Sequence, residues 1–465
     1  MIIIILLTPL VVLPLAMEDA FRGVGSFHKS ENEFIQAGVD LFAKPTVELS
    51  SRFCRESVHR PISENPEGPF EFFLPSENET YIDPEGFRLE GYVYLVKGDG
   101  SEEKGLDNND KTAPISMIPI TAWSMKELFI NGYLVNYVTQ PYENIKAYIE
   151  NELSYGSDIK NTILSTTSLY KAETLGKMDD LVNNTVFLTE NCPKWIDKKK
   201  HAFSVPLQLD VLSTERFLPN KMDLNIRLTK APDSLLCMSA NETTRAKVRF
   251  YDLKLISRRV TLDKKVLMDH SSRFGGGQEA IIPFVRTDIK TYTLSTGVLE
   301  SRTNSIYRKK IPNSAIICFV DNSAISGSYK LNPLNFQNFD IAEVAFYCNS
   351  EKICSYKQDY SKSDYAISYR RFMDEIGVKT NNIGNNIKAE RWAKELNLYA
   401  FDFSPDKCQG FHDHVAMSGN LDFVVRFKET TPKPITMLII THYDDTILLD
   451  EARNVINRHD PIAIA

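Results

Sequence analysis

Three pairs of segments in this chain of 465 residues match one another, and they occur in the same order along the sequence. The second pair is the closest, because its seven positions read apolar, Asp, apolar, variable, β-branched, Arg, apolar in both copies. The pairs are residues 127–132 with 343–349, residues 222–228 with 421–427, and residues 248–263 with 435–450. A repeat of this order, with copies of roughly 170–200 residues, predicts a duplicated domain.

Each copy contains short alternating strands and turns rather than long helices. Segments such as 89–96, 207–211 and 399–403 alternate in the way that half-buried strands do. Aromatic residues make up 11% of the chain and favour pleated sheets. Each copy also has one helical stretch, with Tyr148 and Tyr369 each eight residues before a glycine. These features predict an all-β fold of two tandem jelly-roll domains, or β-sandwiches, with short helix inserts.

The repeat also predicts where the domains begin and end. Residues 264–273 can form a short helix that the glycines at 275–277 end, so this region is expected to be a flexible connection. The polar stretches 98–114 and 322–338 are expected to be loops that reach a neighbouring molecule or form an outer tower. The expected parts are an apolar segment at 1–16, an N-terminal arm at 17–60, a first roll at 61–263, a linker at 264–284, a second roll at 285–455 and a tail at 456–465.

The first 16 residues leave the location of the protein open. They are almost wholly apolar, like the core of a signal peptide, but no basic residue precedes them and two prolines interrupt them. If they are cleaved, the protein is secreted; if Met17 is the true start, it is intracellular or part of a virion. The glycosylation sequons at Asn78, Asn183 and Asn241 do not decide between these alternatives. No stretch after residue 16 is apolar enough to span a membrane.

The charge of the chain limits its partners. A formal net charge of −7 excludes the basic footprint over the whole protein that is typical of nucleic-acid binding. No sequence-specific nucleic-acid partner is therefore expected. The dense basic run is residues 198–200, with Lys194 nearby. Its ordinary interpretation is a solvated loop, and the alternative is a local contact with an anion.

No motif in the sequence carries recognisable chemistry. His412 and His414 would face the same side of a strand and could hold a metal, but no third ligand can be named. Nucleophile and phosphate-loop motifs are missing as well. We therefore expect no catalytic residues, no cofactor and no metal, and a protein that is not an enzyme. Seven scattered cysteines are expected to be free and mostly buried thiols: Cys54, Cys192, Cys237, Cys318, Cys348, Cys354 and Cys408.

Several stretches of the chain resemble the double jelly-roll major capsid proteins of Polinton, or Maverick, elements and of adintovirus-like elements. The resemblance covers about residues 70–455, and its motifs are structural, so no active site is carried over. The N-terminal apolar segment departs from the family. The matching stretches are 111–114, 125–132, 148–156, 176–179, 216–220 and 228–238 in the first copy, and 320–322, 327–329, 332–336, 401–402 and 418–421 in the second.

The resemblance implies a structural protein that assembles as a homotrimer, so that six similar rolls form a pseudo-hexagonal capsomer of a virus-like shell. A penton-type minor capsid protein is the further partner that it implies. The copy encoded by this sequence is then a genomic relic or a domesticated gene. The alternative is a secreted β-sandwich binding protein, and a third hypothesis is a carbohydrate-active enzyme on a jelly roll, for which the sequence offers no carboxylate pair.

Overall fold

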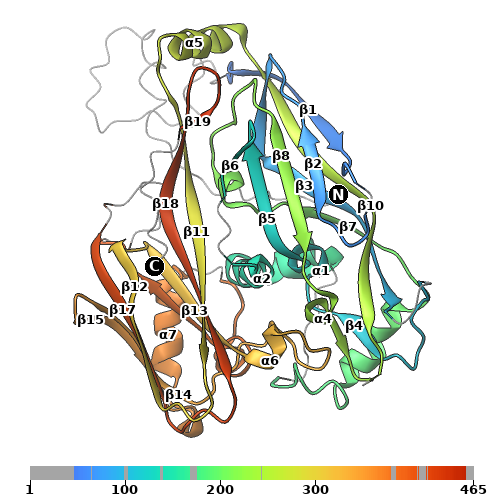
Figure 1. Cartoon of the computed structure of the whole chain (residues 1–465), viewed down its shortest axis with the longest axis vertical. Coiled ribbons are helices and arrows are strands. Elements are labelled where there is room, and N and C mark those ends of the chain that lie inside the picture. The colour runs from blue at the N-terminus through green and yellow to red at the C-terminus, as the bar shows by residue number, and fades with distance from the viewer. Residues whose placement is uncertain are drawn as a thin grey trace, which may run out of the picture.

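The computed structural model describes residues 47–456, apart from 64, 99–102, 137–139, 168–174, 242, 379–383, 406, 408–414 and 416. The described chain forms two β-sandwiches that lie side by side (Figure 1). Helix α5 (Lys264–Gly275) lies between them in the sequence and caps one end of the molecule.

The first sandwich consists of two four-stranded antiparallel sheets and a small extra pair. One sheet has the order β1 (Ser51–His59), β10 (Ala246–Leu262), β3 (Thr80–Lys97) and β7 (His201–Pro206). The other has the order β2 (Phe70–Leu74), β8 (Leu224–Lys230), β5 (Trp123–Ile130) and β6 (Tyr133–Leu134). The extra pair is β4 (Thr112–Pro114) and β9 (Cys237–Ser239).

The second sandwich repeats this plan. One sheet has the order β11 (Ala280–Leu294), β18 (Ile435–Leu449), β13 (Ser314–Asp321) and β16 (Leu398–Asp402), with β19 (Val455–Ile456) on β18. The other has the order β12 (Glu300–Lys310), β17 (Ser418–Phe427), β14 (Ile341–Cys348) and β15 (Glu351–Lys357).

The strand order is the same in both sandwiches. If β4, β9 and β19 are left out and strands are counted within each sandwich, both have sheets of order 1-8-3-6 and 2-7-4-5. First and last strands therefore pair in each, as they do in a jelly roll. The three segment pairs that suggested a duplication fall on β5 and β14, on β8 and β17, and on β10 and β18. Each pair occupies equivalent places, so the predicted duplication is correct.

Helices lie between equivalent strands of the two rolls. In the first roll α2 (Glu143–Ser154) follows β6, and in the second α7 (Ala366–Glu375) follows β15. Tyr148 and Tyr369 lie on these helices, as the sequence predicted. The other α-helices are α1 (Ile118–Thr121), α3 (Ser157–Asn161), α4 (Asp233–Leu236), α6 (Asn322–Ile325) and α8 (Ala389–Lys394). Short 3-10 or π-helical turns are η2 (Leu164–Thr167), η3 (Phe187–Asn191), η4 (Cys192–Trp195), η5 (Asp210–Ser213) and η6 (Tyr360–Lys362).

Alternation along the strands fills the core of each roll. In β8, Leu224, Ile226 and Leu228 are fully buried, while the residues between them are half-buried. In β17, Phe423 and Val425 are fully buried in the second roll, and Val424 between them is buried as well. Burying one such side chain contributes about 1.5–3 kcal/mol, so the repeated pattern stabilises both rolls in the same way.

One predicted strand is wrong, and two observed strands begin inside segments predicted as an arm and a linker. β1 begins at Ser51, inside the predicted arm at 17–60, and β11 begins at Ala280, inside the predicted linker at 264–284. Both strands pair along their length with the last strand of their roll, which the sequence pattern did not show. We therefore propose domain limits near 51–262 and 280–456. The predicted strand at 207–211 is an irregular segment that leads into η5, because the Asp210 side chain binds the other roll.

Candidate functional site

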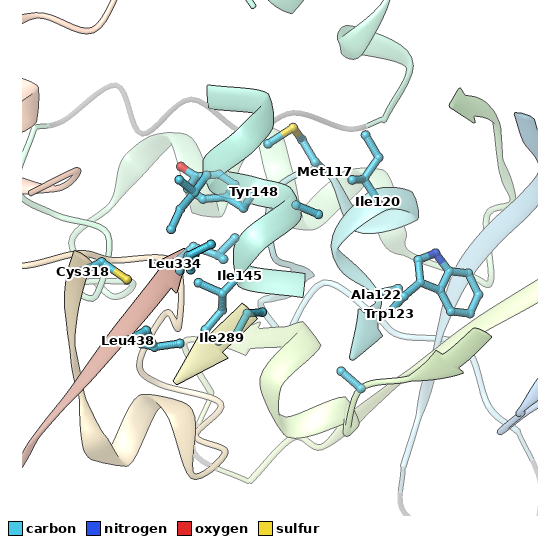
Figure 2. Close-up of a cluster of buried hydrophobic side chains, with 14 of the residues drawn as sticks. Met117, Ile120, Ala122, Trp123, Ile145, Tyr148, Ile289, Cys318, Leu334 and Leu438 are labelled. Atoms are coloured by element: carbon cyan, nitrogen blue, oxygen red, sulfur yellow. The ribbon is translucent and has the colours of Figure 1, made fainter. Parts of the chain in front are cut away.

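Helix α2 lies between the two rolls, and the site is built around it. Figure 2 shows α2 with Met117 and Ile120 of the first roll on one side and Leu334 and Leu438 of the second on the other. The ring of Tyr148 lies 6.0 Å from the ring of Phe336, centroid to centroid. Tyr148 of the first roll therefore packs against the second roll as well. We call this contact region the seam.

An ionic cluster crosses the middle of the seam. Lys146 on α2 forms a short ion pair with Asp210 and lies 3.6 Å from Glu143 and 3.8 Å from Glu150. Asp210 also accepts a hydrogen bond of 2.6 Å from the backbone N–H of Thr287 on β11, in the second roll. One carboxylate therefore binds a cation of the first roll and a main-chain donor of the second.

The surroundings of this cluster shift the protonation of its members. Burial, together with the charges of Asp210 and Glu143, raises the pKa of Glu150 to about 7. Burial, together with the charge of Lys146, lowers the pKa of His442 on β18 to about 4. His442 Nδ1 lies 3.0 Å from the hydroxyl oxygen of Ser314, so the neutral ring has a partner. The seam thus holds a titratable carboxyl near neutral pH.

A second ionic group joins α2 to α8. Two nitrogens of Arg391 donate to the two carboxylate oxygens of Glu152, each over 3.0 Å. Lys160 donates to Glu152 over 2.8 Å and to the backbone oxygen of Asn385 over 3.1 Å. Burial opposes the charge of Glu152, but Arg391 and Lys160 hold its pKa at about 2. This carboxylate is buried and fully compensated, which is the condition for a stable buried ion pair.

A loop of the second roll completes the lower part of the seam. Asp179 accepts hydrogen bonds from the backbone N–H of Asn332 (2.7 Å), from Asn335 Nδ2 (2.7 Å) and from Gln337 Nε2 (3.0 Å). Leu334 is fully buried beside them. The stretch 322–338 was expected to reach a neighbouring molecule. Residues 332–337 bind the first roll of the same chain instead, because their amides match a carboxylate there.

At the other end of the molecule, Arg453 of the second roll forms a further contact between the rolls. Its guanidinium carbon lies 3.5 Å from the ring centroid of Phe274 on α5. Its backbone oxygen accepts a hydrogen bond of 2.9 Å from Asn131, just after β5. Arg453 also donates to Asn220 over 3.3 Å. Contacts at both ends and in the middle therefore fix the angle between the two rolls.

The outer edge of the first roll is exposed. Among the described residues, no strand pairs with the free edge of β1, and Phe53 and Val58 on it are 62% and 59% exposed. Arg55 and Glu56 also lie on this strand, and such charges discourage unspecific pairing of edges. This edge is available to a partner, whereas the seam is not.

The residues that we had considered for chemistry give no site within the described part of the chain. His412 and His414, with Cys408, lie outside the described residues. Within the described residues no group of three or more His, Cys, Asp or Glu side chains is placed to hold a metal. The six described cysteines are free; Cys192, Cys237 and Cys318 are buried, Cys348 and Cys354 are half-buried, and Cys54 is exposed.

A hollow between the two rolls is too small for a substrate. A cavity of about 50 Å³ lies near Met178, Phe187 and Asn332, and this volume suits a water molecule or two rather than a substrate. In the part of the chain that the structure covers, no helix has both the length and the apolar character that crossing a bilayer requires.

Comparisons with known proteins agree on the fold. No protein-family model matches the chain. An uncharacterized protein of Caenorhabditis elegans, F54H12.2, is 22% identical over 403 residues, which cover 84% of this chain and 93% of that protein. A chain of the Sputnik virophage superposes with a TM-score of 0.62 at 12% identity. The superposition covers 91% of this chain and 92% of the virophage chain.

Two further solved structures are similar. A chain of the PBCV-1 virus capsid gives a TM-score of 0.58 at 10% identity, with 90% of this chain and 100% of that one covered. The Faustovirus major capsid protein gives a TM-score of 0.52 at 7% identity, with 87% of this chain and 92% of that one covered. The chain has the double jelly-roll fold of viral capsid proteins. The resemblance expected from the sequence is confirmed at the level of this fold.

The seam of the double jelly roll could not be found from the sequence. Tyr148 was singled out for its helix, but nothing placed that helix between the rolls. Asp210, Glu152 and Arg391 stand in no motif, and their partners are distant in sequence. Of the seam segments, only the loop 332–336 stood out in the sequence, because it is part of the resemblance to the capsid family. The resemblance did not show that this loop binds Asp179.

Proposed function

We propose that this protein is a capsid-type structural protein of the Polinton or Maverick kind, and that three copies form a pseudo-hexagonal capsomer of a virus-like shell. The observation that carries the proposal is the pair of rolls with identical strand order, held at a fixed angle by the seam. Similarity to virus capsid chains over nine tenths of the length supports it.

The geometry of closure follows from the duplication. Each chain supplies two similar corners, so three chains related by a threefold axis supply six. The two rolls of a chain must keep a fixed angle, because a flexible hinge at the seam would allow many angles and only some of them would close the ring. The buried ion pairs of Glu152 and Asp210 favour one arrangement over others, since displaced partners would leave charges unpaired.

Electron microscopy of the purified protein tests the proposal. Class averages with threefold symmetry and a six-cornered outline are expected, with each pair of neighbouring corners formed by one chain. Averages that show only single two-lobed particles at the highest attainable concentration would contradict it. Co-expression with a penton-type minor capsid protein then tests whether capsomers close into shells.

The alternative is a secreted β-sandwich binding protein, which the apolar residues 1–16 favour. The structure makes the sequons unequal for this alternative. Asn78 is exposed, whereas the side chain of Asn241 donates to the backbone oxygen of Asn109 over 3.1 Å and accepts from Thr243. A secreted form would therefore carry a glycan at Asn78, and a glycosidase-sensitive gel shift that an Asn78→Gln variant loses would support it.

A further inference from the structure

The lysine-rich turn before β7 has no carboxylate partners among the described residues. Lys194, Lys198, Lys199 and Lys200 are exposed, and none of them forms an ion pair with a carboxylate in the part of the chain that the structure describes. The acid of the turn itself is Asp197. The turn therefore holds several uncompensated positive charges, although the whole chain carries −7.

Three tyrosines lie next to these lysines on the outer face of the first roll. Tyr92 and Tyr94 are on β3 and alternate with the buried Val93, and Tyr251 stands opposite Tyr92 on β10. The rings of Tyr92 and Tyr251 are 6.2 Å apart and 38% and 52% exposed. Lys200 Nζ lies 3.3 Å from the ring centroid of Tyr251 and 6.0 Å from that of Tyr94. We call these tyrosines and lysines the tyrosine–lysine patch.

Three acidic residues beside the tyrosines, unlike Asp197 in the turn, are already paired with cations. Glu90, Glu103 and Asp252 each bind a cation of the same roll, so they do not neutralise the lysines of the turn. The pairs are Glu90 with Arg88, Glu103 with Arg249, and Asp252 with Arg60 and Lys254. Burial lowers the pKa of His201 beside the turn; the hydrogen bond with the backbone oxygen of Lys194 raises it, and the charges of Lys199 and Lys194 lower it.

We propose that the tyrosine–lysine patch binds single-stranded nucleic acid without preference for base sequence. Lysines 194 and 198–200 contact the phosphates, and the exposed faces of Tyr92 and Tyr251 stack on bases, as in other proteins that bind single strands. Charge complementarity selects a polyanion. A neutral polysaccharide would also stack on tyrosines, but it needs carboxylate or amide groups for its hydroxyls, and the patch presents ammonium groups instead.

Fluorescence anisotropy with the full chain and a labelled oligothymidylate of about 20 nucleotides tests the proposal. Between about 50 and 200 mM salt, the logarithm of the binding constant should fall with the logarithm of salt with a slope of about −2 to −3, as three to four phosphate contacts require. A K199E/K200E variant should bind at least about tenfold more weakly and with a smaller slope.

A matched control distinguishes the effect of the patch on binding from the effect of the protein's net charge. The variant K264E/K265E changes two exposed lysines on α5, so its net charge is the same, and it should bind within about twofold of the original protein. Tyr251→Ala keeps every charge and should weaken binding about tenfold at an unchanged slope. Thermal melting of all variants confirms that they are folded.

Three results would overturn the proposal: no salt-dependent binding by the folded protein, equal weakening in K264E/K265E, or binding of heparin that the oligonucleotide does not compete with. The last result would assign the patch to a sulfated glycan instead. The proposal does not depend on trimer formation, because a monomer presents the same patch.

Discussion

Arg391 and Glu152 are 239 positions apart in the sequence, and they form two parallel hydrogen bonds of 3.0 Å across the seam. The carboxylate side chain is 4% exposed and also binds Lys160, whose side chain is 7% exposed. Three charged groups from two rolls thus meet in one buried place. A double jelly roll of fixed shape depends on such contacts, since no sheet among the described residues contains strands of both halves.

Removing this carboxylate should destabilise the protein. Glu152→Ala removes the carboxylate that binds Arg391 and Lys160 in the seam, and breaking a buried pair in this way costs about 3–5 kcal/mol. The control is Asp374→Ala, which removes the exposed partner of Arg370 on α7 and should cost no more than about 0.5 kcal/mol. Chemical denaturation of both variants measures the difference. Equal losses in the two variants would show that the seam pair does not hold the rolls together.

The seam should also make stability depend on pH through Glu150. Its pKa in the fold is about 7, above its ordinary value of 4.5, so the fold binds a proton more tightly than the unfolded chain does. The protonated Glu150 therefore contributes to the free energy of unfolding; this contribution is fully present below pH 4.5 and is lost as the pH rises through about 7. His442 acts in the opposite direction, since its pKa is lowered to about 4 and its contribution is lost as the pH falls from 6.5.

A Glu150→Gln variant isolates the carboxyl, because His442, Lys146, Asp210, Glu143 and Lys126 remain around it. The stability of the original protein relative to the variant should fall between pH 5 and pH 8, which span the pKa of about 7. Melting temperatures measured in parallel at both pH values give this difference. A constant difference would mean that Glu150 does not titrate in the seam.

Metal analysis tests the absence of a metal site over the whole chain, including His412 and His414. We expect less than about one tenth of an equivalent of zinc or copper per chain, because the described residues contain no ligand set and the sequence offers no third ligand beside His412 and His414. One equivalent that disappears in the His412→Ala, His414→Ala double variant would establish a site and revise the structural role.

The fold was predictable because it is repeated. The match of residues 222–228 with 421–427 identified β8 and β17 before their sheets were known. Edge strands were harder: all of β1 is exposed or half-buried, so it lacks the alternation that marks a strand with one buried face. Asp210 and Arg391 were out of reach, because side chains that meet only in the folded chain leave no spacing in the sequence.

The central claim is that two rolls per chain make a trimer, and the native mass of the protein expressed from Met17 tests it most directly. A permanent ring must bury on the order of 2,000 Å² or more at each contact, so it should persist on dilution. Light scattering at about tens of micromolar should then give a single species of three chain masses. A monodisperse species of one chain mass would contradict the capsomer and favour a secreted or domesticated single-copy module.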